Sequence, residues 1–258
     1  MLRSIIKPIE EELDSVEGSI NSQLNLKAGH IGSFAHLELS YTNKTIRPAL
    51  VILSSRIYKY DPQKTAALAS AFQFIYMASR VHQGVSEKDS DYIKGDSDPR
   101  DGSQFPVLVG DYLYGKFFTF LFDAGIINFL SDLAEVICQI HEGCIMKRRV
   151  NTQRISSKKM REIVHKETAE LFSCCCYLGG RVAGAPKKDQ EMMKRFGLNL
   201  GMAYGLMEMG VPVEKSTFYL EAALNFLSLI PNQPEKEILL KLVQHLSGST
   251  LSLRRMVI

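Results

Sequence analysis

Apolar residues recur along this chain at the three- and four-residue spacing of amphipathic helices. The pattern predicts a first helix over residues 1–22, a second starting near Arg47, and a third over residues 63–82 that is apolar nearly all round and therefore buried. Further helices are expected over residues 107–123, 126–150, 157–183, 187–210, 214–229 and 233–247. No strand alternation stands out, so the predicted fold class is all-α.

The breaks between these segments indicate how the helices are connected. From residue 86 to residue 106 the apolar signal fades, which predicts a long loop of the kind that is usually functional or mobile. Tight turns such as Gly184-Ala185-Pro186 predict that sequential helices pack antiparallel. We therefore expect one domain over residues 1–258, built as an antiparallel helical bundle.

Composition narrows the class of protein. The 258 residues are 45% hydrophobic and 23% charged, which excludes disordered and fibrous chains. A net charge of +3 without a broad basic patch argues against a nucleic-acid partner. No window approaches the ~18 apolar residues of a transmembrane segment, so we expect a cytoplasmic protein. Three of the five cysteines are consecutive, at Cys174, Cys175 and Cys176, which predicts free thiols packed inside a helix.

Three segments carry a recognisable set of motifs. Asn43-Lys44-Thr45-Ile46-Arg47-Pro48 opens a helix, Ser79-Arg80-Val81-His82-Gln83-Gly84-Val85-Ser86-Glu87 follows the buried helix, and Val107-Leu108-Val109-Gly110-Asp111-Tyr112-Leu113 begins the next one. These segments resemble trans-polyprenyl diphosphate synthases, all-helical enzymes that join isoprenyl diphosphates head to tail. The similarity spans essentially the whole chain, and it implies a bundle of the isoprenoid synthase type.

The chain departs from that family where the family does its chemistry. There, two Asp-Asp-x-x-Asp motifs face each other and hold Mg²⁺, which prefers ionised carboxylates. The first motif falls on Gln83, Gly84 and Glu87, and the second falls on Glu208, Met209 and Pro212, where the proline is expected to break the helix. We therefore expect no catalytic residue, metal site or cofactor in this chain, and Mg²⁺ only in a catalytic partner.

Supporting positions of the family pattern are replaced as well. The Glu and His of the family's Glu-x-x-His fall on Gln73 and Tyr76, and the Glu and Gln of its Gly-Glu-x-x-Gln fall on Cys144 and Lys147. The family's Lys before its Thr-Ala pair falls on Glu167, and its Gln before the second motif falls on Gly205. A stretch of roughly twenty residues that follows the second motif in the family is missing between Pro212 and Phe218. The resemblance thus extends to the frame of the site but not to its reactive groups.

Two cations of the diphosphate-binding set remain. In the family, the residues matched by Lys44 and Arg47 grip the diphosphate of isopentenyl diphosphate. Two cations three residues apart at a helix start can bind an anion, but Arg47-Pro48 can equally cap the helix while Lys44 is solvated. His82 is expected to be packed or hydrogen-bonded rather than a ligand. In the family, product length depends partly on side-chain size just ahead of the first motif, and Met77, Ala78 and Ser79 at these positions predict an open cavity.

The leading hypothesis is a non-catalytic or regulatory subunit of a heteromeric trans-polyprenyl diphosphate synthase. Such a subunit would aid the stability, product length or product release of a catalytic partner, in a heterodimer or heterotetramer, and it could form a homodimer when alone. The aromatic run at residues 116–122 suits either an interface or a core helix. Two alternatives stay open: a diphosphate- or isoprenoid-binding protein without catalysis, or a self-sufficient divergent prenyltransferase. That enzyme would bind metal through Glu87, Glu208 and loop aspartates among Asp89, Asp91, Asp96, Asp98 and Asp101.

Overall fold

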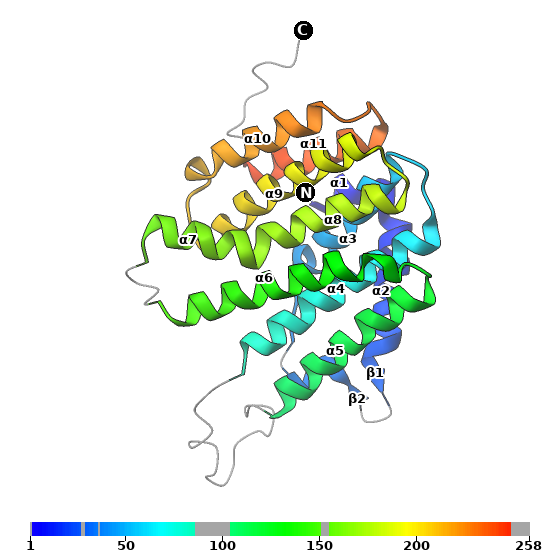
Figure 1. Cartoon of the computed structure of the whole chain (residues 1–258), viewed down its shortest axis with the longest axis vertical. Coiled ribbons are helices and arrows are strands. Elements are labelled where there is room, and N and C mark those ends of the chain that lie inside the picture. Colours follow the sequence, from blue (N-terminus) through cyan, green and yellow to red (C-terminus); the bar gives the residue numbers. More distant parts are fainter. Residues whose placement is uncertain (1, 27–28, 36, 86–103, 151–154, 249–258) are drawn as a thin grey trace.

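The chain folds as an antiparallel bundle of helices in the computed structural model, which describes residues 2–26, 29–35, 37–85, 104–150 and 155–248 (Figure 1). The main helices are α1 (Leu2–Ile6), α2 (Glu10–Leu24), α3 (Tyr41–Arg56), α4 (Pro62–Gln83), α5 (Gln104–Asp123), α6 (Leu130–Arg148), α7 (Ser157–Val164), α8 (Glu170–Val182), α9 (Lys187–Glu208), α10 (Thr217–Ser228) and α11 (Pro234–Leu246).

Short elements connect or interrupt these helices. They are the 3₁₀ turns η1 (Lys7–Ile9), η2 (Ile31–Ala35), η5 (Ile127–Phe129) and η8 (Val213–Lys215), the π-helical turn η7 (His165–Ala169), and an antiparallel pair of two-residue strands, β1 (Asn25–Leu26) and β2 (Gly29–His30). The predicted all-α class is confirmed. No helix in the described part of the chain combines the length and apolarity needed to cross a membrane.

Glycines let the central helices approach closely. A Cβ atom on Gly197 of α9 would lie 2.4 Å from the backbone oxygen of Phe172 in α8. A Cβ atom on Gly179 of α8 would lie 2.7 Å from the backbone oxygen of Val51 in α3. Because real Cβ atoms do not come this close to backbone oxygens, α3, α8 and α9 can pack at this separation only with glycine at those positions.

Helix α3 begins earlier than the sequence pattern predicted. Ser40 caps it, and the Ser40 hydroxyl oxygen accepts a hydrogen bond from the amide of Asn43 at 3.2 Å. Lys44, Arg47 and Pro48 therefore lie inside the helix rather than at its start. The interpretation that Arg47-Pro48 caps the helix is wrong, because Ser40 satisfies the first-turn amide instead.

Helix α9 ends before Pro212, as expected, although a glycine rather than the proline ends it. The amide of Val211 donates to the oxygen of Leu206 at 3.0 Å, and that of Gly210 donates to the oxygen of Met207 at 2.9 Å. Gly210 has φ +77°, the left-handed conformation that this C-terminal motif requires. Glu208 consequently occupies the last turn, Met209 caps the helix, and Pro212 lies outside it.

The segment predicted as one helix over residues 157–183 is interrupted by η7. A π-helical turn inserts a residue, so the side chains on either side of it face different neighbours from those of an unbroken α-helix. Farther along, Cys174, Cys175 and Cys176 are buried free thiols in α8, which confirms that prediction, whereas the free thiol of Cys138 in α6 is exposed.

Candidate functional site

Asn43 in α3 joins the helices that surround the predicted site. Its side-chain amide donates to Glu208 Oε1 at 3.4 Å, and its Oδ1 accepts from the Tyr204 hydroxyl at 2.9 Å, both on α9. Its backbone oxygen accepts from Gln73 Nε2 of α4 at 3.1 Å. Burial and the neighbouring Glu208 raise the pKa of Tyr204, so this hydroxyl keeps its proton at neutral pH. The carboxylate left from the second motif is thus tied into a structural network.

Arg47 is a buried cation, with 2% of its surface exposed. Its guanidinium carbon lies 3.3 Å from the ring centroid of Tyr76 and 5.4 Å from that of Phe172. One guanidinium nitrogen donates to the backbone oxygen of Asn43 at 3.4 Å, while the buried Nε atom has no hydrogen-bond partner in the described residues. In the described part of the chain, no carboxylate forms an ion pair with this guanidinium group. The aromatic faces partly offset the cost of removing its charge from water.

Lys44 points away from Arg47. Its ammonium group lies 3.4 Å from Glu17 of α2, and both side chains are about half exposed, at 50% and 51%. It lines a pocket of about 210 Å³ between α2, α3 and α4, whereas Arg47 packs on Tyr76 of α4 and Phe172 of α8. The structure therefore does not bring the two predicted diphosphate ligands to one site, and their binding role stays a prediction.

Gln83, at the end of α4, contacts a thiol and arginine side chains, none of which can bind a divalent cation as an anionic oxygen does. Its side-chain amide donates to Cys144 Sγ at 3.1 Å, and its Oε1 accepts from Arg80 at 3.2 Å. Arg148 donates to the backbone oxygens of Gln83 and Val85 at 3.0 Å and 2.9 Å. Mg²⁺ needs anionic oxygens, and this end of α4 presents a neutral amide beside two cations.

An internal ion pair lies next to Gln83. Glu167 Oε2 of η7 is 3.2 Å from Lys147 Nζ of α6, and the Glu167 side chain is only 11% exposed. Its other carboxylate oxygen is buried and has no partner among the described residues. Gly143 makes room for it, since a Cβ atom there would lie 2.7 Å from Glu167 Cγ. Burial and then the Glu167 carboxylate raise the pKa of Cys144 to about 11, so this thiol is not a nucleophile.

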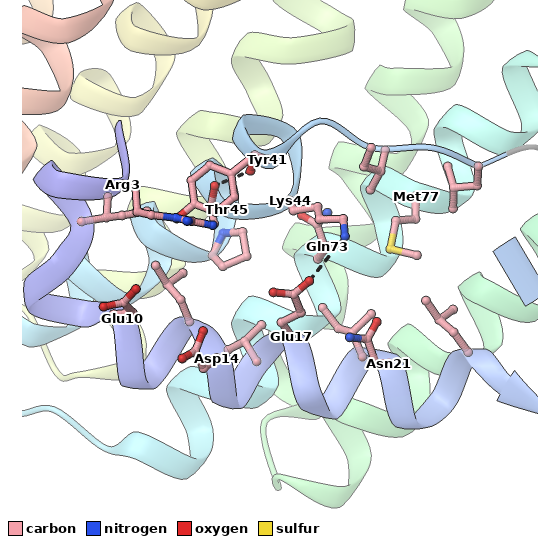
Figure 2. Close-up of a pocket in the computed structure, with 18 of the residues that line it drawn as sticks. Arg3, Glu10, Asp14, Glu17, Asn21, Tyr41, Lys44, Thr45, Gln73 and Met77 are labelled. Carbon is pink, nitrogen blue, oxygen red and sulfur yellow. Dashed lines mark hydrogen bonds and ion pairs between the residues drawn. The ribbon is translucent and has the colours of Figure 1, made fainter. Parts of the chain in front are cut away.

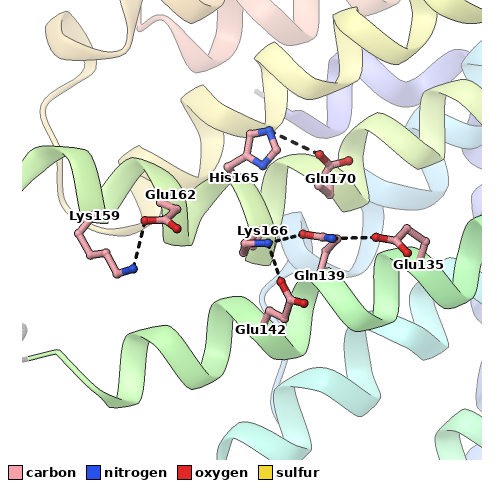
Figure 3. Close-up of polar contacts among 8 residues, drawn as sticks. All are labelled: Glu135, Gln139, Glu142, Lys159, Glu162, His165, Lys166 and Glu170. Carbon is pink, nitrogen blue, oxygen red and sulfur yellow. Dashed lines mark hydrogen bonds and ion pairs between the residues drawn. The ribbon is translucent and has the colours of Figure 1, made fainter.

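The π-helical turn sets which of its side chains faces this site. Lys166 donates outward to Gln139 at 2.6 Å and to Glu142 at 2.7 Å on α6, as Figure 3 shows. Glu167 instead faces Lys147. The sequence revealed the replacements at 147 and 167 separately, but only the structure shows that they compensate each other. Opposite charge changes at two positions were the signal that could have found the pair.

His82 is packed and hydrogen-bonded, as predicted. Its Nε2 lies 3.4 Å from both Asp111 Oδ1 and the backbone oxygen of Val107. A Cβ atom on Gly110 would overlap the imidazole at 2.0 Å, which explains the glycine at that position. In the described residues, no group of three or more His, Cys, Asp or Glu side chains is arranged to hold a metal ion. Glu87 and the loop aspartates lie outside the described residues.

The two small side chains near the end of α4 are packed against their surroundings. Ala78 and Ser79 are buried, and the Ser79 hydroxyl donates to the backbone oxygen of Tyr76 at 2.8 Å. One turn earlier, the rings of Phe74 in α4 and Phe120 in α5 lie 5.4 Å apart, centroid to centroid. Met77 lines the pocket beside α2. The open cavity predicted from Ala78 and Ser79 stays a prediction.

Sequence comparisons place these features in context. The sequence profile of the polyprenyl synthetase family matches residues 33–208. Octaprenyl diphosphate synthase of Escherichia coli is 26% identical over 209 residues, which are 80% of this chain and 65% of that protein. Heptaprenyl diphosphate synthase component 2 of Geobacillus stearothermophilus is 27% identical over 211 residues, again 80% and 65%. The chain thus spans less than two thirds of the length of these relatives.

Solved structures show the same fold. A decaprenyl diphosphate synthase from Rhodobacter capsulatus has a TM-score of 0.81 at 18% identity and covers 98% of this chain and 100% of its own. The geranyl diphosphate synthase small subunit from Antirrhinum majus has a TM-score of 0.74 at 16% identity, with 95% and 99% covered. At this identity the likeness concerns the arrangement of the helices.

Proposed function

Because the chain belongs to the polyprenyl synthetase family, we propose that it acts as a non-catalytic or regulatory subunit of a heteromeric trans-polyprenyl diphosphate synthase. A catalytic partner would elongate allylic diphosphates with isopentenyl diphosphate and hold the Mg²⁺. Two of the similar proteins are named as a component and a small subunit of such enzymes, which supports this assembly.

The observation that carries the proposal is the charge at the end of α4. Where the family has an aspartate of its first motif, Gln83 is bound by Cys144 and Arg80, and Lys147 close by is paired with Glu167. Magnesium-assisted departure of diphosphate requires several oxygen anions around the metal ions. Loss of groups that act as a set commonly costs orders of magnitude in rate. The described residues therefore support a structural or regulatory role better than catalysis.

Helix α5 exposes several large apolar side chains. Leu108, Phe118 and Phe122 of α5 are 65%, 47% and 74% exposed, and Ile145 of α6 is 52% exposed. Single exposed apolar side chains are common on any protein, whereas several on one helix, two of them aromatic, are typical of interface cores. These side chains support a partner that covers α5.

The test is to mix the purified chain with the complete polyprenyl diphosphate synthase of the same organism. We expect a mixed complex on size exclusion and a change in the partner's rate or product length. Phe122→Asp should abolish the complex, whereas Phe218→Asp, on α10 and equally exposed at 73%, should leave it intact. A partner that neither binds the chain nor changes its products would overturn the proposal.

A second candidate is a diphosphate-binding protein without catalysis, and one observation favours it. Arg47 is a buried cation whose Nε lacks a partner in the described residues, and such groups are costly unless an anion compensates them. Calorimetry with isopentenyl diphosphate decides this point: binding by the lone chain that is lost in Arg47→Gln supports the candidate. Binding that is absent, or unchanged in that variant, removes it.

A further inference from the structure

The pocket of about 210 Å³ beside α2 is separate from the ends of α4 and α9, and Figure 2 shows its surroundings. Its floor is apolar, because Leu13, Val16 and Ile20 of α2 and Met77 of α4 line it with buried side chains. Polar side chains surround that floor. This combination fits an amphiphilic molecule, whose apolar part would lie on the floor and whose head group would meet the polar side chains.

The two cations of the pocket already have neighbours. Lys44 lies 3.4 Å from Glu17, and the guanidinium carbon of Arg3 lies 5.0 Å from the ring centroid of Tyr41. The hydroxyl of Thr45 donates to the backbone oxygen of Tyr41. The charge of Lys44 is therefore already compensated by a carboxylate, and that of Arg3 lies near an aromatic face.

Several hydrogen-bond acceptors of the pocket remain unpaired. Glu10 and Asp14 are exposed on the same side of α2 as Glu17, and within the described residues neither has an ion pair or a hydrogen bond (Figure 2). A second, independent observation concerns Gln73, which lines the pocket and is 2% exposed. Its Nε2 is used by Asn43, and its buried Oε1 has no partner in the part of the chain described here. A buried acceptor of this kind calls for a donor.

We propose that this pocket binds a cationic amphiphile, with a protonated amine that donates to the unpaired acceptors of the pocket and an apolar chain along the floor. The carboxylates of Glu10, Asp14 and Glu17 outnumber the cations of Arg3 and Lys44, so the pocket disfavours anions. A cavity of ~150 Å³ holds benzene, so the 210 Å³ here accommodates a chain of roughly eight to ten carbons. The inference does not depend on the proposed subunit role.

Three probes with one hydrocarbon tail test the head-group preference: geranylamine, geraniol and geranyl diphosphate. Calorimetry at pH 7 on the full chain should rank their affinities in that order. The double variant Glu10→Gln with Asp14→Asn should weaken geranylamine about threefold to tenfold, the range expected for exposed charge pairs. The same variant should leave geraniol unchanged.

Glu11→Gln is the matched control, because Glu11 is exposed on α2 but does not line the pocket. It should leave all three affinities unchanged. All of these positions are exposed, so the variants should fold, which circular dichroism checks. The proposal is overturned if geranylamine does not bind, if geranyl diphosphate binds as tightly as the amine, or if the double variant behaves like the control.

Discussion

The Lys147 and Glu167 pair predicts an asymmetry between two single substitutions. Lys147→Met removes the cation and leaves a carboxylate that is 11% exposed, with one oxygen already unpartnered. An uncompensated buried acceptor costs about 1–3 kcal/mol of unfolding free energy. Glu167→Gln leaves Lys147, whose side chain is 38% exposed, free to turn into water. The loss of that half-exposed partner should cost only about 0.5–1 kcal/mol.

Urea unfolding followed by circular dichroism measures both free energies, and a thermal melt gives the melting temperatures. Lys147→Met should be the more destabilising change, with a melting temperature lower by roughly 2–12 °C in a chain of this length. The control is Lys159→Met, because Lys159 and Glu162 form an exposed pair at 3.1 Å that should contribute less than about 0.5 kcal/mol (Figure 3). If Glu167→Gln costs as much as Lys147→Met, or Lys147→Met costs no more than the control, this description of the pair is refuted.

Three further predictions concern local features of the bundle. Ser40→Ala should lower the unfolding free energy by about 1 kcal/mol through loss of the α3 cap, whereas Ser40→Asp should retain it in the same urea titration. Gly197→Ala should destabilise the fold by about 1–3 kcal/mol, since its Cβ atom would lie 2.4 Å from a backbone oxygen of α8. Gly18→Ala, whose Cβ atom would have nothing within 4 Å, should stabilise the fold by about 0.5–1 kcal/mol, and thermal melts compare the two variants. Burial raises the pKa of Cys176 to about 12, so at pH 8 a thiol reagent should react quickly with the exposed Cys138 but not with Cys176. The stabilisation from keeping Cys176 protonated should be lost as the pH rises above about 9.

Much of the architecture follows from the spacing of apolar residues. The buried helix predicted over residues 63–82 is α4 at 62–83, and the helix predicted over 187–210 ends two residues earlier, at Glu208. Periodicity failed at the start of α3, because Ser40 acts through a hydrogen bond rather than through burial. It also missed η7, since one inserted residue changes the spacing of apolar positions by no more than the difference between the three- and four-residue steps of an ordinary α-helix.

The sequence predicted that the candidate site lacks the carboxylates of the family motifs, but it did not predict the contacts that the replacing side chains make. The sequence marks Gln83 and Gly84 as neutral, but it does not show that Cys144 and Arg80 bind the Gln83 amide. Lys44 and Arg47 are three residues apart in one helix, yet their long side chains reach different neighbours. Spacing along a helix restricts where a side chain starts, while tertiary contacts decide where its charged end lies.

The proposal that this chain does not itself transfer prenyl groups has a direct test. The measurement is incorporation of labelled isopentenyl diphosphate into farnesyl diphosphate with Mg²⁺, by the chain alone at high concentration and by the chain mixed with a complete homologue. The account predicts no product from the lone chain, and a rate or product length in the mixture that differs from that of the homologue alone. Metal-dependent turnover by the lone chain, lost in Glu208→Gln, would contradict it and would favour a self-sufficient enzyme with an unconventional metal site.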